Sequence, residues 1–99
     1  AAIRARVTAA RQRQLARFLG KKIYANAQMG PRDIKRHCGA PAEAEKLLET
    51  AVTRLGFSAR AYARVLKVAR TVADLEGRET IATVHVSEAI QYRMMDKFR

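Results

Sequence analysis

Residues 58–78, SARAYARVLKVARTVADLEGR, form the longest uninterrupted helical pattern in the chain, and the other segments are organised around it. A helix turns about 100° per residue, so this segment is predicted to be apolar on one side and basic on the other. Ser58 is suited to cap the start of the helix, and Gly77 is suited to end it in a left-handed conformation. The apolar stripe comprises Tyr62, Val65, Leu66, Ala69, Val72 and Ala73. The opposite ridge comprises Arg60, Arg64, Lys67 and Thr71.

Three further segments repeat apolar residues at helical spacing. They are residues 3 to about 18, which are rich in Ala and Arg, residues 41–55, and residues 84 to about 97 after a capping Thr83. No segment alternates apolar and polar residues for long enough to make a pair of strands. The sequence therefore predicts an all-α fold, a small bundle of about four helices plus a short helical turn.

The connection between the first two long helices is predicted to be ordered but irregular. It covers residues 23–30, after which Pro31 is suited to open a short helical turn that runs through Cys38. We expect three of its side chains to plug into the core: Ile23, Tyr24 and Met29.

The length and the first residues of the chain predict a single domain that is part of a longer protein. A chain of 99 residues makes a single domain, and because it does not begin with Met and Ala1 reads as mid-helix, we expect a fragment of a longer protein. The one cysteine, Cys38, cannot form an internal disulfide, which favours a reducing, cytoplasmic compartment. The sequence contains no apolar run of about 18 residues, so no membrane span is predicted.

Charge is the strongest compositional signal. The net charge is +11, and residues 1–36 carry ten Lys or Arg against the single acid Asp33. This excess predicts a polyanionic partner, either nucleic acid or nucleotide phosphates. The alternative is a solvated surface on which arginine stems cover apolar groups. The nucleic-acid candidates are Arg4, Arg11, Arg13, Arg17, Lys21 and Lys22.

Several kinds of site are absent from the sequence. His37, Cys38 and His85 do not have the spacing of a zinc site, so no metal site is expected. No GxxxxGK[ST] phosphate loop is present, so this chain by itself should not hydrolyse ATP. The corner from residue 48 to residue 66 superficially resembles a helix-turn-helix, but its second helix carries a single row of cations instead of base-reading polar residues.

The residues FSARAYARVLKVARTVADLEGRETI (57–81), followed by HVSEAIQYR (85–93), closely resemble the C-terminal domain of magnesium-chelatase-related AAA+ proteins, the bacterial proteins linked to competence and DNA branch migration. The N-terminal RARVTAARQRQLAR (4–17), the Asn26 region and Cys38 also resemble that family. The match covers nearly the whole chain, so residues 1–99 are interpreted as one C-terminal lid domain of a larger AAA+ protein.

The resemblance implies a role in an ATPase ring. Such proteins pair an ATP- and Mg²⁺-binding core with a helical lid in the same chain, and typically assemble as hexamers. The sensor-2 arginine of the lid falls on Arg60 by match to the SAR motif, with Arg64 as a second candidate. The lid would couple the nucleotide state to remodelling on DNA, although chelation as the task of the whole protein stays open.

Two other functions remain open at this stage. One is a nucleic-acid-binding helical module that works without ATP and resembles a helix-turn-helix. The other is an oligomer-interface domain.

Overall fold

The computed structural model describes residues 2–97, and all regular structure in that range is helical. The elements are α1 (Ala2–Arg17), the 3₁₀ turn η1 (Asn26–Gln28), α2 (Pro31–His37), α3 (Ala42–Leu55), α4 (Ala59–Leu75) and α5 (Thr83–Lys97). The prediction of an all-α bundle of four long helices and a short helical turn is confirmed. Among the described helices, none has the length and apolar character that crossing a membrane would require.

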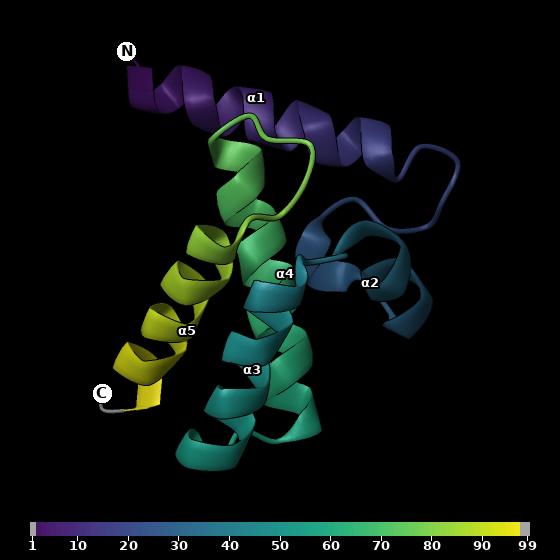
Figure 1. The fold of residues 1–99 in the computed structure, drawn as a ribbon. Coiled ribbons are helices and arrows are strands. Elements are labelled where there is room, and N and C mark those ends of the chain that lie inside the picture. The colour runs from purple at the N-terminus through teal and green to yellow at the C-terminus, as the bar shows by residue number, and fades with distance from the viewer. Residues whose placement is uncertain (1, 98–99) are drawn as a thin grey trace.

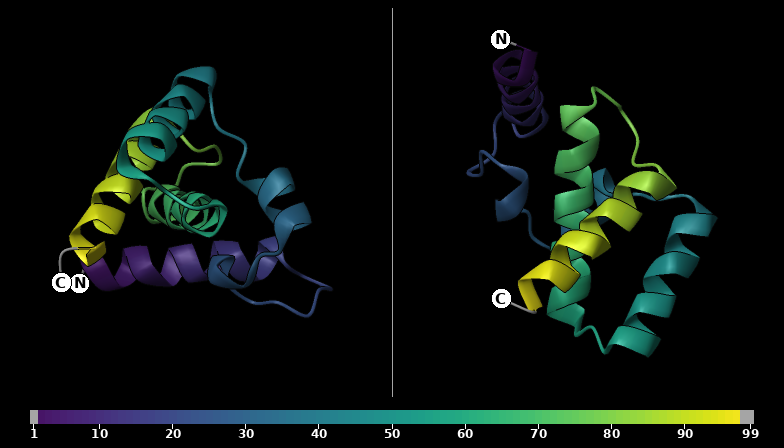
Figure 2. Two further views of the ribbon diagram at one scale, coloured as in Figure 1. Left: turned by 90° about the horizontal axis from the view of Figure 1, so that it is seen from below. Right: turned by 90° about the vertical axis from the view of Figure 1, so that its left-hand side faces the viewer.

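Helix α4 is the centre of the fold. α5 packs along α4 and α3 packs against α5, whereas α1 crosses α4 near its C-terminal end, and η1 and α2 lie against another side of α4 (Figures 1 and 2). The core is built from the facing sides of these helices, and its largest apolar members with almost no exposure are Leu48, Val65 and Val86.

Both ends of α4 form as the sequence predicts. The Ser58 hydroxyl oxygen accepts a hydrogen bond of 3.1 Å from the Ala61 N–H, which caps the helix. Gly56, at the end of α3, and Gly77, just beyond α4, have φ angles of +70° and +72°, which only glycine adopts without strain.

The predicted apolar stripe of α4 is buried for most of its length. Val65, Leu66, Ala69 and Ala73 are buried, whereas Tyr62 and Val72 are half-buried. The first half of the predicted ridge faces outward, with Arg60 and Arg64 exposed. Lys67 and Thr71 are half-buried, because η1 packs against them and Asn26 Nδ2 donates to Thr71 Oγ1 at 3.1 Å.

Two local predictions are wrong. Tyr24 does not plug into the core but is 66% exposed, because the chain turns where the Tyr24 N–H donates to Gln28 Oε1, and Met29 fills the interior instead. Thr83 does not precede the last helix but is its first residue. His85 does the capping, since its Nδ1 accepts a hydrogen bond of 2.8 Å from the Ala82 N–H.

Candidate functional site: the basic groove beside α4

A groove of about 660 Å³ runs along the outer side of α4. Ala27 of η1 and Tyr92 of α5 flank it, so three elements shape its walls. Its apolar lining includes the half-buried Val68 and Val72. Its cations are Arg60, Arg64 and Lys67. We call this the basic groove.

Arg60 and Arg64 are the two cations of the basic groove that remain unengaged. Both are exposed, and within the described range neither makes a hydrogen bond or ion pair. Lys67 differs, because its Nζ donates to the Ala27 carbonyl oxygen at 3.2 Å and ties α4 to η1. Arg60 lies in the first turn of α4, where the positive end of the helix dipole disfavours a cation. The first turn of α4 thus has no acidic residue and carries an unpaired arginine. This arrangement does not stabilise the helix, but it is suited to binding an anionic ligand.

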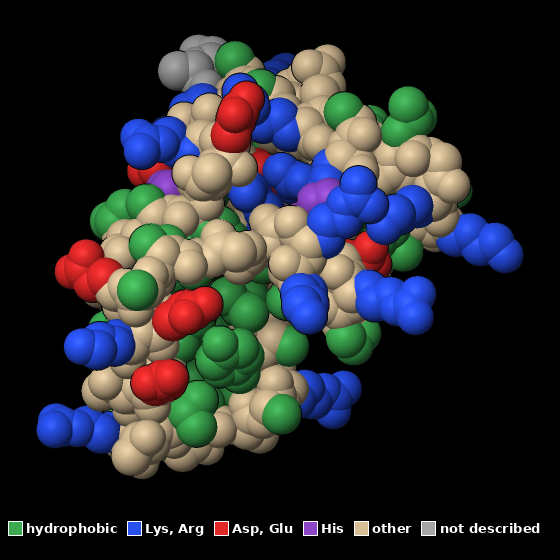
Figure 3. All heavy atoms as spheres, turned by 45° about the vertical axis from the view of Figure 1, so that its right-hand side comes forward, with side chains coloured by type: hydrophobic (Ala, Val, Ile, Leu, Met, Phe, Trp, Pro, Cys, Tyr) green, Lys and Arg blue, Asp and Glu red, His purple; other side chains and the backbone are tan. Residues whose placement is uncertain are grey.

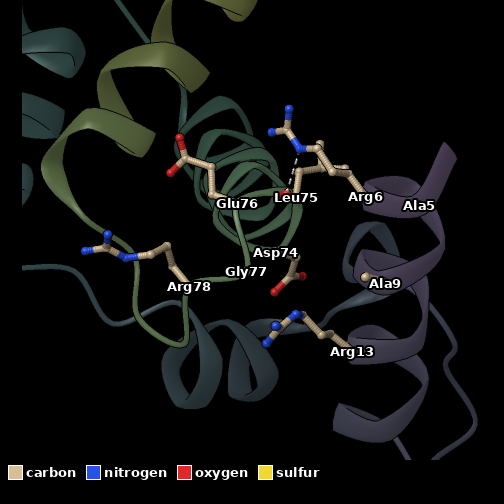
Figure 4. Close-up of a pocket in the computed structure, with 9 residues that line it drawn as sticks. All are labelled: Ala5, Arg6, Ala9, Arg13, Asp74, Leu75, Glu76, Gly77 and Arg78. Carbon is tan, nitrogen blue, oxygen red and sulfur yellow. Dashed lines mark hydrogen bonds between the residues drawn. The ribbon is translucent and has the colours of Figure 1, made fainter. Parts of the chain in front are cut away.

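The arginines of α1 do not form a single polyanion-binding row. Arg6 Nε donates to the Leu75 carbonyl oxygen at 3.2 Å, and Arg13 Nη2 lies against the Gly77 turn (Figure 4). Both therefore complement the negative C-terminal end of α4. They line a second cavity, of about 720 Å³, between α1 and that end of α4. In the part of the chain that the structure describes, Arg4 and Arg11 stay exposed without a hydrogen bond or ion pair.

Arg17 points into the molecule. Its Nη2 lies 2.7 Å from Asp74 Oδ1, and its Nη1 donates to Asp74 Oδ2 and to Asn26 Oδ1, both at 2.9 Å. Arg17 thus holds α1 and η1 against α4, and this engagement favours a packing role over a nucleic-acid contact. Lys21 pairs with Asp33 at 2.7 Å, whereas Lys22 is exposed.

The buried ion network at Asp74 was not predicted from the sequence. The Asp74 side chain has no exposure, and it also accepts from Asn26 Nδ2 at 2.8 Å and pairs with Arg70 Nη2 at 3.2 Å. Arg70 is 3% exposed and donates to the carbonyl oxygens of Arg78 and Glu79. Arg70 and Asp74 are four residues apart and flank the apolar stripe. Residues at this spacing are neighbours on a helix, so the sequence contained a signal for their ion pair.

Opposing effects act on the pKa of Asp74. Burial alone raises the pKa of this carboxyl, but hydrogen bonds from Arg17 and Asn26 and the charges of Arg17 and Arg70 hold it below 3.8. Asp74 is therefore ionised at neutral pH and balances two guanidinium groups.

Cys38 and His85 belong to the interior. Cys38 is buried, and burial raises the pKa of its thiol to about 11. Both ring nitrogens of His85 have a hydrogen-bond partner. Nδ1 accepts from the Ala82 N–H, so the ring proton lies on Nε2, which faces the Glu76 carboxylate. Across residues 2–97, no three His, Cys, Asp or Glu side chains gather where they could hold a metal ion.

A family model described as magnesium chelatase, subunit ChlI C-terminal, matches residues 1–93. The chain belongs to this family. The chain is 40% identical over 97 residues to the uncharacterized protein YifB of Salmonella typhimurium, a match that covers 98% of the chain and 18% of YifB. It is 44% identical over 70 residues to the competence protein ComM of Haemophilus influenzae, covering 71% of the chain and 14% of ComM.

YifB of Escherichia coli is 38% identical over 97 residues, with 98% of the chain and 18% of YifB covered. The chain thus spans less than a fifth of the length of these relatives, and no solved structure matches it. Membership in the magnesium chelatase C-terminal family confirms the resemblance identified in the sequence.

Proposed function

We propose that this magnesium chelatase C-terminal domain is the helical lid of an AAA+ ATPase, in which Arg60 contacts the γ-phosphate of ATP as the sensor-2 arginine. The observation that carries the proposal is the unpaired, exposed Arg60 in the first turn of α4, at the rim of the basic groove. Family membership supports it, because the chain is a C-terminal part of a magnesium-chelatase-like protein.

The basic groove fits a nucleotide phosphate chemically. A guanidinium is planar, stays charged and presents paired N–H donors to phosphate oxygens. Arg64 lies one helical turn from Arg60 on the same ridge, so both can face one polyphosphate. ATP with Mg²⁺ would be held mainly by a core domain of the same protein, and Arg60 would stabilise charge that develops on the transferred phosphoryl group.

The fold supplies a way to transmit the nucleotide state. Arg60 lies at one end of α4, and the Asp74 network holds the other end against α1 and η1. A change in the position of Arg60 would therefore move the domain as a unit. In the whole protein, which we propose is a cytoplasmic homohexamer, this motion would couple ATP turnover to remodelling of DNA. Chelation is the alternative task.

A helix-turn-helix that acts without ATP is less well supported. The outer side of α4 near its start presents Ala59 and the half-buried Ala63 beside the two arginines. Alanine offers no hydrogen bonds to base edges, so this helix lacks the polar array that reads a sequence.

The test is Arg60→Ala in a full-length ATPase that carries this domain. We expect steady-state ATP turnover to fall on the order of a thousandfold, as when a cation that stabilises a transferring phosphoryl group is removed. Arg60→Lys should recover little, because an ammonium cannot reproduce the planar fork. The isolated domain should change stability by less than about 0.5 kcal/mol, because Arg60 is exposed.

Arg54→Ala is the matched control. Arg54 is also an exposed arginine near a helix end, in the last turn of α3, but it does not line the basic groove. Normal turnover in the Arg60 variant, or equal losses in the two variants, would rule out the sensor assignment.

A further inference from the structure

Five exposed cations lie together on the side of the molecule that carries α2. Lys21 and Lys22 lie in the loop after α1, and Arg32, Lys35 and Arg36 lie on α2. The ion pair between Lys21 and Asp33 fastens the loop to α2, so the two segments are neighbours. Figure 3 shows Lys and Arg side chains gathered on this side. We call these five residues the α2 basic face.

The cations on α2 repel one another, although Lys35 and Arg36 in its last turn complement the helix dipole. Arg32 lies three residues before Lys35 and four before Arg36, spacings at which like charges on one helix face repel. The only acid from residue 21 to residue 36 is Asp33, which is occupied by Lys21 Nζ and by the Gly30 N–H. The repulsion on α2 is therefore not offset within this segment.

His37 is half-buried beside these cations. It lies at the end of α2, with its ring edge-on to Phe18 at a centroid distance of 5.6 Å. Burial lowers the pKa of His37 most, and the charges of Arg17, Arg36 and Lys21 lower it further. The charge of Asp33 acts in the opposite direction.

An aromatic side chain projects from the same loop. Tyr24 is 66% exposed, and Leu19, earlier in the segment between α1 and η1, is 86% exposed. The core does not use the Tyr24 ring, although the sequence pattern predicts that it would. Tyr24 follows Lys21 and Lys22 along the loop, which the Lys21–Asp33 ion pair fastens to α2. An exposed ring in a basic segment is the combination on which the bases of a single strand stack while the phosphates are neutralised.

We propose that the α2 basic face, together with Tyr24, binds single-stranded nucleic acid. The cations contact backbone phosphates, and Arg32 and Arg36 donate paired hydrogen bonds from their planar guanidinium groups. A base stacks on Tyr24. This deepens the proposed function by giving the polymer substrate a contact on this domain, and its relevance to remodelling rests on that function.

A single strand fits better than the other polyanions. A duplex hides its base faces, so an exposed aromatic ring would contribute nothing to its binding. An anionic membrane binds helices whose cations border a broad apolar face, but the side of α2 opposite the cations packs Ile34 against the core. Binding of an acidic protein to these cations would not require an exposed aromatic ring such as that of Tyr24.

The experiment measures binding of the 99-residue chain, without ATP, to a fluorescent DNA strand of roughly 16 nucleotides and mixed sequence across a range of salt concentrations. The double variant Lys35→Gln/Arg36→Gln should lower the slope of log K against log salt by about 1.4, since each phosphate contact contributes about 0.7 on single strands. Tyr24→Ala should weaken binding about tenfold, and Tyr24→Phe, which keeps the ring, less than about twofold.

The matched control is Lys46→Gln/Arg54→Gln, which removes the same two charges from exposed positions on α3. It should leave the salt slope near that of the unchanged chain, and circular dichroism should show that all variants stay helical. The strand-binding assay contains no ATP and the turnover assay of Arg60→Ala contains no strand, so a failure of the ATP role and a failure of this site appear in separate assays.

Three outcomes would overturn the proposal. They are equal effects of the α2 and α3 double variants, normal binding by Tyr24→Ala, and binding to anionic lipid vesicles or to duplex DNA that exceeds binding to the single strand.

Discussion

Replacing Asp74 with alanine should destabilise this domain more than any surface change. Asp74 has no exposed side-chain area and balances Arg17, at 2.7 Å, and Arg70, at 3.2 Å. Removing the carboxylate leaves Arg70, which is 3% exposed, as a buried cation without a counter-ion. It also removes the acceptor for Asn26 Nδ2, which lies 2.8 Å from Asp74 Oδ2.

The expected loss is about 3–5 kcal/mol, the usual cost of leaving a buried charge uncompensated. A domain of this size has a total stability of roughly 5–15 kcal/mol, so much of it would disappear. The melting temperature should fall by roughly 15 °C or more, since about 1 kcal/mol corresponds to 4–8 °C in a chain of up to 100 residues. Asp74→Asn should recover no more than roughly half of the loss, because the amide lacks the charge and presents its own N–H donors to a site full of donors.

The assay is urea and thermal unfolding followed by the helical circular dichroism signal. Glu49→Ala is the control, because Glu49 is an exposed acid on α3 without an ion pair in the described part of the chain, and its loss should change stability by less than about 0.5 kcal/mol. A loss below about 1 kcal/mol for Asp74→Ala would refute the reasoning, since the network would then contribute no more than a surface ion pair.

The same network predicts a dependence on pH. The pKa of Asp74 in the folded protein lies below its ordinary value of 3.8, so its ionised form stabilises the fold at pH values above 3.8. This stabilisation is lost as the pH falls through the pKa of the folded state. The stability difference between the unchanged chain and Asp74→Asn should therefore be constant near neutral pH and shrink in acid below 3.8.

Two further predictions concern single residues. Cys38, buried and with a thiol pKa raised to about 11, should react with a thiol reagent at mildly alkaline pH far more slowly in the folded chain than in urea, and equal rates would contradict its burial. Gly77→Ala should cost about 1 kcal/mol or more in urea unfolding, because Gly77 has φ +72° and an added Cβ would lie 3.3 Å from Arg13 Nη2, whereas Gly39→Ala, at an open position without positive φ, is the control and should cost clearly less.

The candidate site was predictable in part. The exposure of Arg60 and Arg64 follows from the period of α4, because residues opposite an apolar stripe face outward. That Lys67 on the same ridge bonds Ala27 was not predictable, since η1 follows no helical period that would show where it packs.

The sequence by itself determined the helices, both ends of α4 and the family. Periodicity and capping act over a few residues, so Ser58 and Gly77 could be assigned to the ends of α4 without any knowledge of the fold. Membership in the magnesium chelatase C-terminal family likewise follows from the order of residues along the chain.

Only the tertiary structure decided which charged residues serve packing and which face a partner. Arg17 and Asp74 are separated by 57 positions, and no local pattern shows that they meet. Tyr24 likewise has an apolar ring that the pattern assigns to the core, but the turn after it leaves the ring in solvent. The physical reason is that the burial of a side chain depends on what packs over it, and α4, which covers Arg17, comes from a distant part of the chain.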